Sequence, residues 1–257
     1  MTRESWFTLS RTLCKKGGMK KQIVLVADDF GMGAKINEAI LHAHIAGGLH
    51  AAALMMAQPG TEEAVAMARA HPRLQTGWHL HLNDSCPATL ARWPWGSSPV
   101  RAGISIGLSR SSREIMRREV VRQWELFRST GLPCHFINSH HHLHAHPAVY
   151  QALVEIVGPD FKGWIRLGRI RLFRPVFPFF SKSLLVDAYL RRERRLSIWR
   201  STDTLWGLDR LFAMEAHEVR VAITALPEGF HEFLFHPRTL SCPDTQCLLE
   251  LKSLPTD

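Results

Sequence analysis

The sequence lacks any run of 18 consecutive apolar residues, which excludes a helix that spans a membrane. It has only five cysteines, at irregular spacing and without a C-x-x-C pair, so we expect reduced thiols rather than a disulfide framework or a cysteine zinc site. Acidic residues are the scarcer charge, with 23 Asp and Glu against 32 Lys and Arg. The net charge of +9 favours anionic partners, but the arginines are scattered and match no nucleic-acid-binding pattern, so no nucleic acid is expected.

The chain of 257 residues has an ordinary globular composition, 46% apolar and 21% charged. Its first 18 residues are basic and mix polar with apolar residues, without the apolar core of a secretory signal. Met19, followed by two lysines and an apolar run, reads as a more natural start. We therefore interpret residues 1–18 as a start-site artefact or a short flexible tail, and residues 19–257 as a single cytoplasmic domain.

Short apolar runs alternate with amphipathic segments along the rest of the chain. Residues 23–27 are typical of a strand buried on both faces, and residues 36–46 have helical spacing. Further strands are expected at 51–57, 76–82, 136–137, 164–167, 196–199 and 233–235. Residues 84–110 are rich in Pro, Gly and Ser and are interpreted as a long loop. About seven parallel strands with outer helices predict an α/β fold, a distorted (β/α) TIM-like barrel.

Histidines and aspartates gather at the ends of these predicted strands. Eight of the 15 histidines fall in the segments 79–81 and 135–146. Asp28 and Asp29 end the first strand, and His236 ends the last. Because the carboxyl ends of parallel strands converge on one rim of a barrel, these groups are expected to meet there. Their composition is that of a hydrolytic metal site with acid and base partners.

One carboxylate and two imidazoles leave coordination positions open for water and substrate. A divalent metal held in this way can lower the pKa of bound water to about 7 and polarise a carbonyl group. Asp28 and Asp29 cannot both face the metal from a regular strand, since successive side chains point to opposite faces. One of the two is therefore expected to bind the metal and the other to serve as the base.

Each motif also has a simpler explanation. The Asp-Asp pair can be a turn or a helix cap, and His79 and His81 can line a half-exposed strand face. The run from His140 to His146 can be an adventitious metal-binding tract. A metal-dependent phosphoesterase and a non-enzymatic, histidine-rich metal-binding protein are therefore the rival functions.

Four segments occur in order along nearly the whole chain. They are Ala27-Asp28-Asp29-Phe30-Gly31 with Asn37, Gly77-Trp78-His79-Leu80, Asn138-Ser139-His140-His141-His142-Leu143-His144 and Phe235-His236-Pro237. Together they resemble the YdjC-like carbohydrate deacetylases, a family that includes the chito-oligosaccharide deacetylases. Asn138, with Thr202-Asp203 and Trp206-Gly207-Leu208, looks most like the hopanoid-biosynthesis-associated branch.

The resemblance implies a distorted (β/α) barrel, one divalent metal ion and removal of the acetyl group from an N-acetylated sugar. Asp29, His79 and His140 fall on the metal-ligand positions, and Asp28 falls on that of the base. Two imidazoles favour zinc, and the family is compatible with magnesium, so Mg²⁺ and Zn²⁺ are both retained. The branch implies an N-acetylglucosaminyl hopanoid as substrate, with a chito-oligosaccharide or another N-acetyl sugar as the alternative.

Further residues of the same rim are assigned supporting roles. His236 is the first candidate for the general acid that protonates the leaving amine, and His142 is the second. Substrate contacts or support of the metal ligands are expected from Asn37, His142, His144 and Arg166. Arg166 is expected to hold Asp28 ionised. His141 and His146 are interpreted as supporting or loop residues.

An apolar segment suggests a contact outside the active site. Residues 172–180 are apolar apart from one arginine and two prolines, and the basic run 191–195 follows. Such a pairing suits reversible contact with an anionic membrane, here the inner face of the cell membrane. A core-packing loop followed by a solvated helix end is the alternative. The sequence leaves the oligomeric state open and allows a homodimer.

Overall fold

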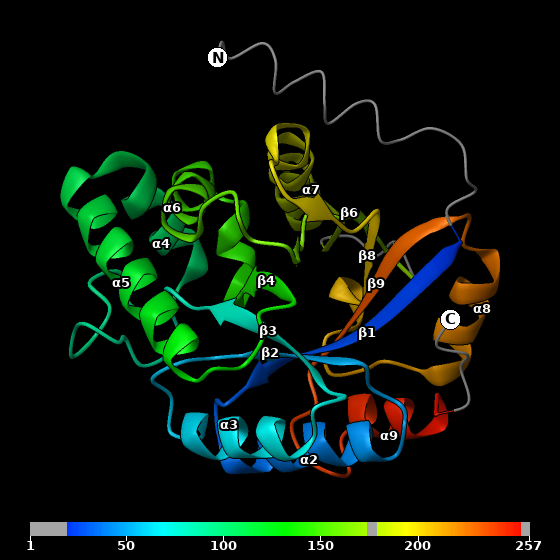
Figure 1. Cartoon of the computed structure of the whole chain (residues 1–257). Helices are drawn as coiled ribbons and strands as arrows, with labels where there is room; N and C mark the ends of the chain where they lie inside the picture. Colours follow the sequence, from blue (N-terminus) through cyan, green and yellow to red (C-terminus); the bar gives the residue numbers. More distant parts are fainter. Residues whose placement is uncertain (1–19, 174–178, 253–257) are drawn as a thin grey trace.

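The structure is a computed structural model that describes residues 20–173 and 179–252. Within these residues, one sheet of nine parallel strands forms the centre, with helices outside it (Figure 1). The strands are β1 (Lys21–Phe30), β2 (Ala51–Leu54), β3 (Gln75–Leu80), β4 (Phe136–Ser139), β5 (Trp164–Ile165), β6 (Arg169–Arg171), β7 (Arg200–Ser201), β8 (Thr204–Trp206) and β9 (Gly229–Phe235). Their order across the sheet is β6-β8-β9-β1-β2-β3-β4-β5-β7.

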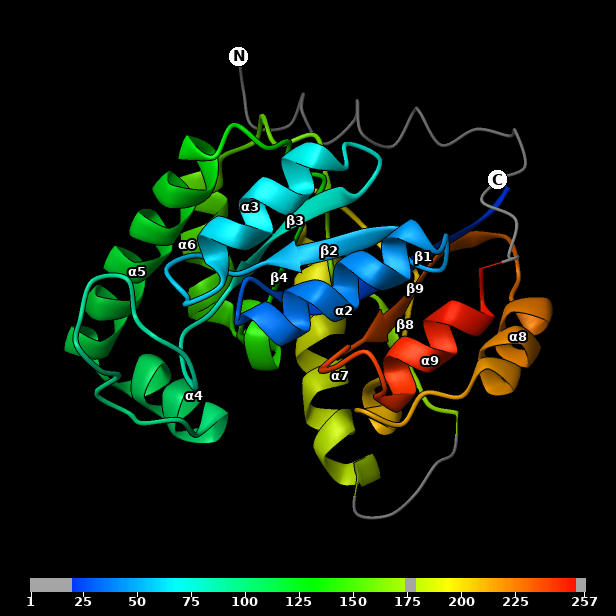
Figure 2. The same cartoon turned by 90° about the horizontal axis from the view of Figure 1, so that it is seen from below.

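The helices connect these strands and cover the outside of the sheet. They are α2 (Ala34–Ile45), α3 (Thr61–Ala70), α4 (Pro99–Leu108), α5 (Arg110–Ser129), α6 (Pro147–Val157), α7 (Phe179–Leu196), α8 (Ala216–Ala225) and α9 (Pro243–Glu250). Two short 3₁₀ turns are η1 (His140–Ala145) and η2 (Leu208–Arg210). In Figure 2, α2 lies between α3 and α9, and contacts join α2 to both neighbours.

The sheet curls until β7 meets β1 and β9. Arg200 of β7 donates from Nη2 to Gln22 Oε1 at 2.7 Å, and its guanidinium lies 4.7 Å from the centre of the Phe230 ring. The backbone N–H of Asp203 donates to the Phe230 carbonyl at 2.6 Å. These contacts close the amino-terminal end of a curled half-barrel. The distorted (β/α) barrel predicted from the alternation of strands and helices is thus confirmed.

The two faces of the strands contribute side chains to different clusters of buried hydrophobic residues. On β1, Leu25 and Ala27 belong to the large cluster shared with the helices. Val24 and Val26 belong to a separate cluster inside the curl, together with Phe136 and Trp164. Because side chains alternate along a strand, Asp28 faces the same interior as the two valines. The interior is therefore apolar near the strand starts and polar near their carboxyl ends.

The long loop predicted over residues 84–110 is wrong, because this segment contains the helix α4. Ser98 caps the helix by accepting a hydrogen bond from the Arg101 N–H at 3.3 Å, and Pro99 occupies the first turn. Ala102 and Ile106 are fully buried and hold the helix to the body of the protein.

The strand expected at residues 196–199 is also wrong, since α7 runs to Leu196 and β7 begins at Arg200. The basic run lies on α7, where ion pairs join Arg191 to Asp187, Arg192 to Glu193 and Arg194 to Asp203. Part of its charge is therefore neutralised.

Several sequence-based expectations concern parts of the chain with little structural description. Residues 1–18, and the centre of the apolar segment 172–180, lie outside the described residues. In the part of the chain that is described, the cysteines are free. No helix there combines the length and apolarity needed to cross a bilayer.

Candidate metal centre and active site

The end of β1 is irregular at the point where its two aspartates lie. Asp29 has a φ of 65°, and the pairing of β1 with β2 shifts in register between Ala27 and Phe30. Such a bulge bends a strand and re-aims its side chains, so the alternation that places Asp28 in the interior does not continue to Asp29. A left-handed backbone costs a residue other than glycine roughly 1–2 kcal/mol, and such strain is concentrated at functional sites.

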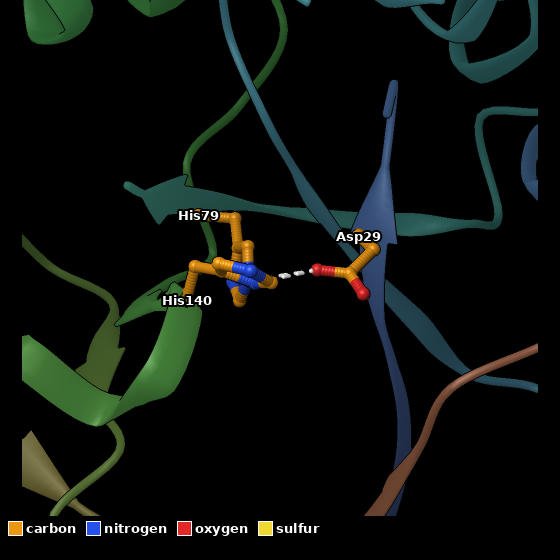
Figure 3. Close-up of side chains that lie close together, drawn as sticks. All are labelled: Asp29, His79 and His140. Atoms are coloured by element: carbon orange, nitrogen blue, oxygen red, sulfur yellow. Dashed lines mark ion pairs between the residues drawn. The ribbon is translucent and has the colours of Figure 1, made fainter. Parts of the chain in front are cut away.

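Three buried side chains from separate elements form the candidate metal centre. Asp29 comes from β1, His79 from β3 and His140 from η1, and their ligand atoms lie within 4.8 Å of one another. His140 Nδ1 lies 2.9 Å from Asp29 Oδ1, and His79 Nε2 lies 3.5 Å from the same oxygen. Figure 3 shows both imidazoles next to the carboxylate. The structure thus brings together the three ligands that the family resemblance implied.

Several polar atoms of these three residues are buried without a hydrogen-bond partner. They are both carboxylate oxygens of Asp29 and the Nε2 atoms of His79 and His140, although His140 Nδ1 lies close to Asp29 Oδ1 as an ion pair. A buried polar atom left unpaired costs about 1–3 kcal/mol, so several that converge on one point are best explained by a shared ligand. One carboxylate and two imidazoles are donors that divalent transition metals accept. The residues present therefore fit a divalent metal.

Asn138 connects the metal centre to Asp28. Its Oδ1 lies 2.6 Å from His79 Nδ1, and its Nδ2 donates to Asp28 Oδ1 at 2.8 Å. Because an amide oxygen can only accept, His79 carries a proton on Nδ1, and Nε2, the atom that faces Asp29, is the nitrogen left for a metal. This tautomer is the one that a metal ligand requires.

Asp28 is held by a buried arginine. Arg166 donates from Nη1 to Asp28 Oδ2 at 2.6 Å and from Nη2 to Oδ1 at 3.0 Å. Burial alone would raise the pKa of Asp28, but the charge and hydrogen bonds of Arg166, together with the charges of His79 and His236, outweigh it and hold this pKa well below its usual range. Asp28 is therefore ionised at neutral pH, and the structure places Arg166 where the sequence analysis expected it.

Two charged residues near the centre were missed. Glu232 accepts a hydrogen bond from Arg166 Nε at 2.7 Å, so one guanidinium holds two carboxylates. Burial raises the pKa of Glu232 to about 7, although Arg166 opposes the shift. The signal available in the sequence was an acid inside the apolar strand 229–235. Arg238, an exposed residue, has its Nη2 3.9 Å from Asp29 Oδ2.

The two candidates for the general acid differ in their surroundings. Burial lowers the pKa of His236, but the charges of Asp29 and Asp28 oppose this shift, which places the ring within electrostatic reach of both aspartates. The backbone N–H of His236 donates to Asp244 Oδ2 at 2.7 Å. Burial and the charge of Arg166 hold the pKa of His142 well below its usual range. The pKa of His142 is thus lowered more strongly than that of His236, which favours His236 as the proton donor.

Two other predicted site residues support the loops around the centre. His144 Nε2 lies 2.6 Å from the backbone oxygen of Arg166, and burial lowers the pKa of His144 to about 3. Asn37 Oδ1 accepts the Gly31 N–H at 2.8 Å, which fixes the turn that follows Asp29. Both residues therefore hold backbone segments that carry candidate site residues.

Three further histidines of the two segments do not belong to the group of Asp29, His79 and His140. His81 is buried with its Nε2 2.8 Å from a backbone oxygen, and burial lowers its pKa to about 3. His141 Nε2 lies 3.5 Å from Asp84 Oδ2, and these two form a second, more exposed group with His140 that could hold a metal. His146 caps α6 by accepting the Ala148 N–H at 3.2 Å.

Comparisons with known proteins agree with this arrangement. A family model described as YdjC-like protein matches residues 22–251. The carbohydrate deacetylase of Geobacillus stearothermophilus is 36% identical over 186 residues, which cover 67% of this chain and 73% of that protein. Those of Brevibacillus brevis and Vibrio cholerae are 35% and 30% identical over 137 residues, 52% of this chain in each case. The match spans about half the length of these two relatives, 55% of the Brevibacillus brevis protein and 54% of the Vibrio cholerae protein.

A solved structure from Enterococcus faecalis, described as a cellobiose-phosphate cleavage protein, has a related fold. It superposes with a TM-score of 0.62 and covers 91% of each chain at 18% sequence identity. At this identity the likeness concerns the fold alone, and it agrees with the curled barrel described above.

Proposed function

Because the chain belongs to the YdjC-like family, we propose that it is a carbohydrate deacetylase, a hydrolase that removes the N-acetyl group from an N-acetylglucosamine-type sugar with the aid of one divalent metal ion. The observation that carries the proposal is the convergence of unpaired ligand atoms from Asp29, His79 and His140 beside the ionised Asp28. The names of the curated relatives support this class of reaction.

Asp29, His79 and His140 would hold the metal. A divalent cation bound there polarises the amide carbonyl and lowers the pKa of a water molecule. Two imidazoles and one carboxylate favour zinc, since magnesium prefers oxygen donors. Mg²⁺ is the alternative that the family resemblance keeps open.

Asp28 acts as the base in this proposal. Arg166 and Asn138 fix its two oxygens, so the ionised carboxylate can take the proton of the water that adds to the carbonyl carbon. As the C–N bond breaks, His236 gives a proton to the amine nitrogen, and acetic acid and the free amine leave. Transfer of the proton from Asp28 to His236 restores both groups.

We propose further that the sugar is carried by a hopanoid. The support is the likeness of Asn138 and of the segments 202–203 and 206–208 to the hopanoid-biosynthesis-associated branch. Asn138 bridges His79 and Asp28, so the residue on which the likeness to this branch rests lies at the centre of the site. A chito-oligosaccharide or another N-acetyl sugar is the alternative substrate.

The test is acetate release by the metal-loaded full chain from an N-acetylglucosaminyl hopanoid, from diacetylchitobiose and from an aryl N-acetylglucosaminide. We expect release from all three, fastest from the hopanoid. Faster release from diacetylchitobiose would reject the hopanoid substrate and keep the deacetylase. No release from any substrate would reject the deacetylase, and hydrolysis of an aryl phosphate would then favour a phosphoesterase.

A further inference from the structure

Helix α4 carries a row of exposed aliphatic side chains. Val100, Ile104 and Leu108 are 68%, 57% and 83% exposed. Residues four apart lie on the same side of a helix, so the three form one stripe, opposite the buried Ala102 and Ile106. We call these three residues the α4 stripe. Single exposed apolar residues are common, but an aligned set on one helix indicates a surface that contacts another apolar phase.

The chain around the α4 stripe is basic. Residues 85–113 contain four arginines and no aspartate or glutamate. Arg92, Arg101 and Arg110 are exposed. Arg113 differs, because its Nη1 donates to the Ile106 and Gly107 carbonyls at 3.3 and 2.8 Å and closes the end of α4. Arg101 lies on α4 beside the stripe and Arg110 begins α5 just after it, whereas the nearest acids in the sequence are Asp84 and Glu114. Positive charge therefore predominates around the stripe.

Helix α4 also adjoins the candidate active site. It contacts η1, the turn that carries the metal ligand His140. The approach is close, because a Cβ atom added at Gly107 would lie 3.4 Å from His146 Nε2. Figure 2 shows α4 at the margin of the molecule, beside the amino-terminal part of α5.

We propose that α4 is a docking surface for an anionic lipid bilayer. The α4 stripe would enter the boundary between headgroups and acyl chains, and Arg92, Arg101 and Arg110 would face the lipid phosphates. An apolar helix face bordered by arginine is the pattern of helices that lie in a membrane interface. Charge complementarity selects an anionic surface over a neutral one. The proposal does not rest on the deacetylase activity, since vesicle binding is measured without substrate.

The experiment is co-sedimentation of the full chain with vesicles. Equimolar phosphatidylcholine and phosphatidylglycerol should bind the protein, pure phosphatidylcholine should bind it much less, and added salt should weaken binding to the anionic vesicles. The double variant I104S/L108S should lose at least about tenfold in affinity. The matched control Val221→Ser changes a side chain of similar exposure, 66%, on the distant helix α8 and should bind as the wild type does.

Charge variants provide a second test that does not depend on the apolar residues. R101Q/R110Q should weaken binding about fivefold for each arginine removed, whereas Arg128→Gln, at the far end of α5, should have little effect. Equal binding by the wild type and I104S/L108S, with unchanged thermal midpoints, would overturn the proposal. It would also be overturned if the wild type ignored vesicles and sedimented as a dimer that I104S/L108S dissociates, because the stripe would then bind a second copy.

Discussion

Replacing Asn138 by alanine should weaken metal binding about 10–100-fold, or about 1.4–2.7 kcal/mol. The reason is the 2.6 Å contact between Asn138 Oδ1 and His79 Nδ1, which keeps the proton on Nδ1. Without it, His79 is free to place the proton on Nε2, the atom that faces Asp29, and in that tautomer it cannot bind a metal. Asp28 retains its two contacts with Arg166, so the fold should tolerate the change.

The assay is metal affinity, measured by competition with a chromophoric chelator. Asn138→Asp is the matched variant, because it keeps an oxygen for His79 Nδ1 while it loses the donor to Asp28 and adds a second carboxylate beside it. Its metal affinity should equal or exceed that of the wild type, since a carboxylate raises the basicity of the imidazole. Wild-type affinity in Asn138→Ala, or equal weakening in both variants, would refute the reasoning about the tautomer.

Four further outcomes are expected. Asp28→Asn should lower kcat by about 10²–10⁴ and leave the metal bound; a rate near that of the wild type would remove Asp28 as the base. Glu232→Gln should change kcat when it is made in the wild type but hardly change it when it is made in the Arg166→Lys variant. Additive effects of the two substitutions would show that Glu232 does not act through Arg166. The raised pKa of Glu232 means that the folded state binds its proton more tightly, so stability falls as pH rises. The free energy of unfolding of the metal-free protein, measured with urea relative to Glu232→Gln, should therefore fall by about 3 kcal/mol between about pH 4.5 and 7 and change little above pH 7. A difference between the two proteins that is independent of pH would contradict this. Metal at 100 times its Kd should stabilise the protein by about 2.7 kcal/mol, so a chelator should lower the thermal midpoint, and an unchanged midpoint after metal loss would argue against a site in the folded state.

The barrel could be predicted because its strands are apolar runs separated by amphipathic helices, a pattern that needs only local sequence. Helix α4 was missed because its glycines and serines resemble a loop. The burial of Ala102 and Ile106, which holds this helix to the body of the protein, is not visible in the sequence. Local composition therefore failed where packing against distant residues stabilises the helix.

The candidate site could be predicted in part for a similar reason. The convergence of Asp29, His79 and His140 follows from parallel topology, which places strand ends on one rim. The positive φ of Asp29, which lets neighbouring aspartates serve one site, depends on the bulge and on the turn held by Asn37. The role of Glu232 depends on Arg166, 66 residues away in the chain. Such partnerships become visible only when the barrel is assembled.

The most direct test of the account is a metal titration of the stripped protein, followed by acetate release from an N-acetylglucosamine conjugate. We predict that activity rises linearly and stops at one metal ion per chain, and that Asp29→Ala abolishes both the tight binding and the activity. Activity that ignores the metal would contradict the central claim. So would several equivalent ions that bind without producing activity, as a histidine-rich metal-binding protein would show.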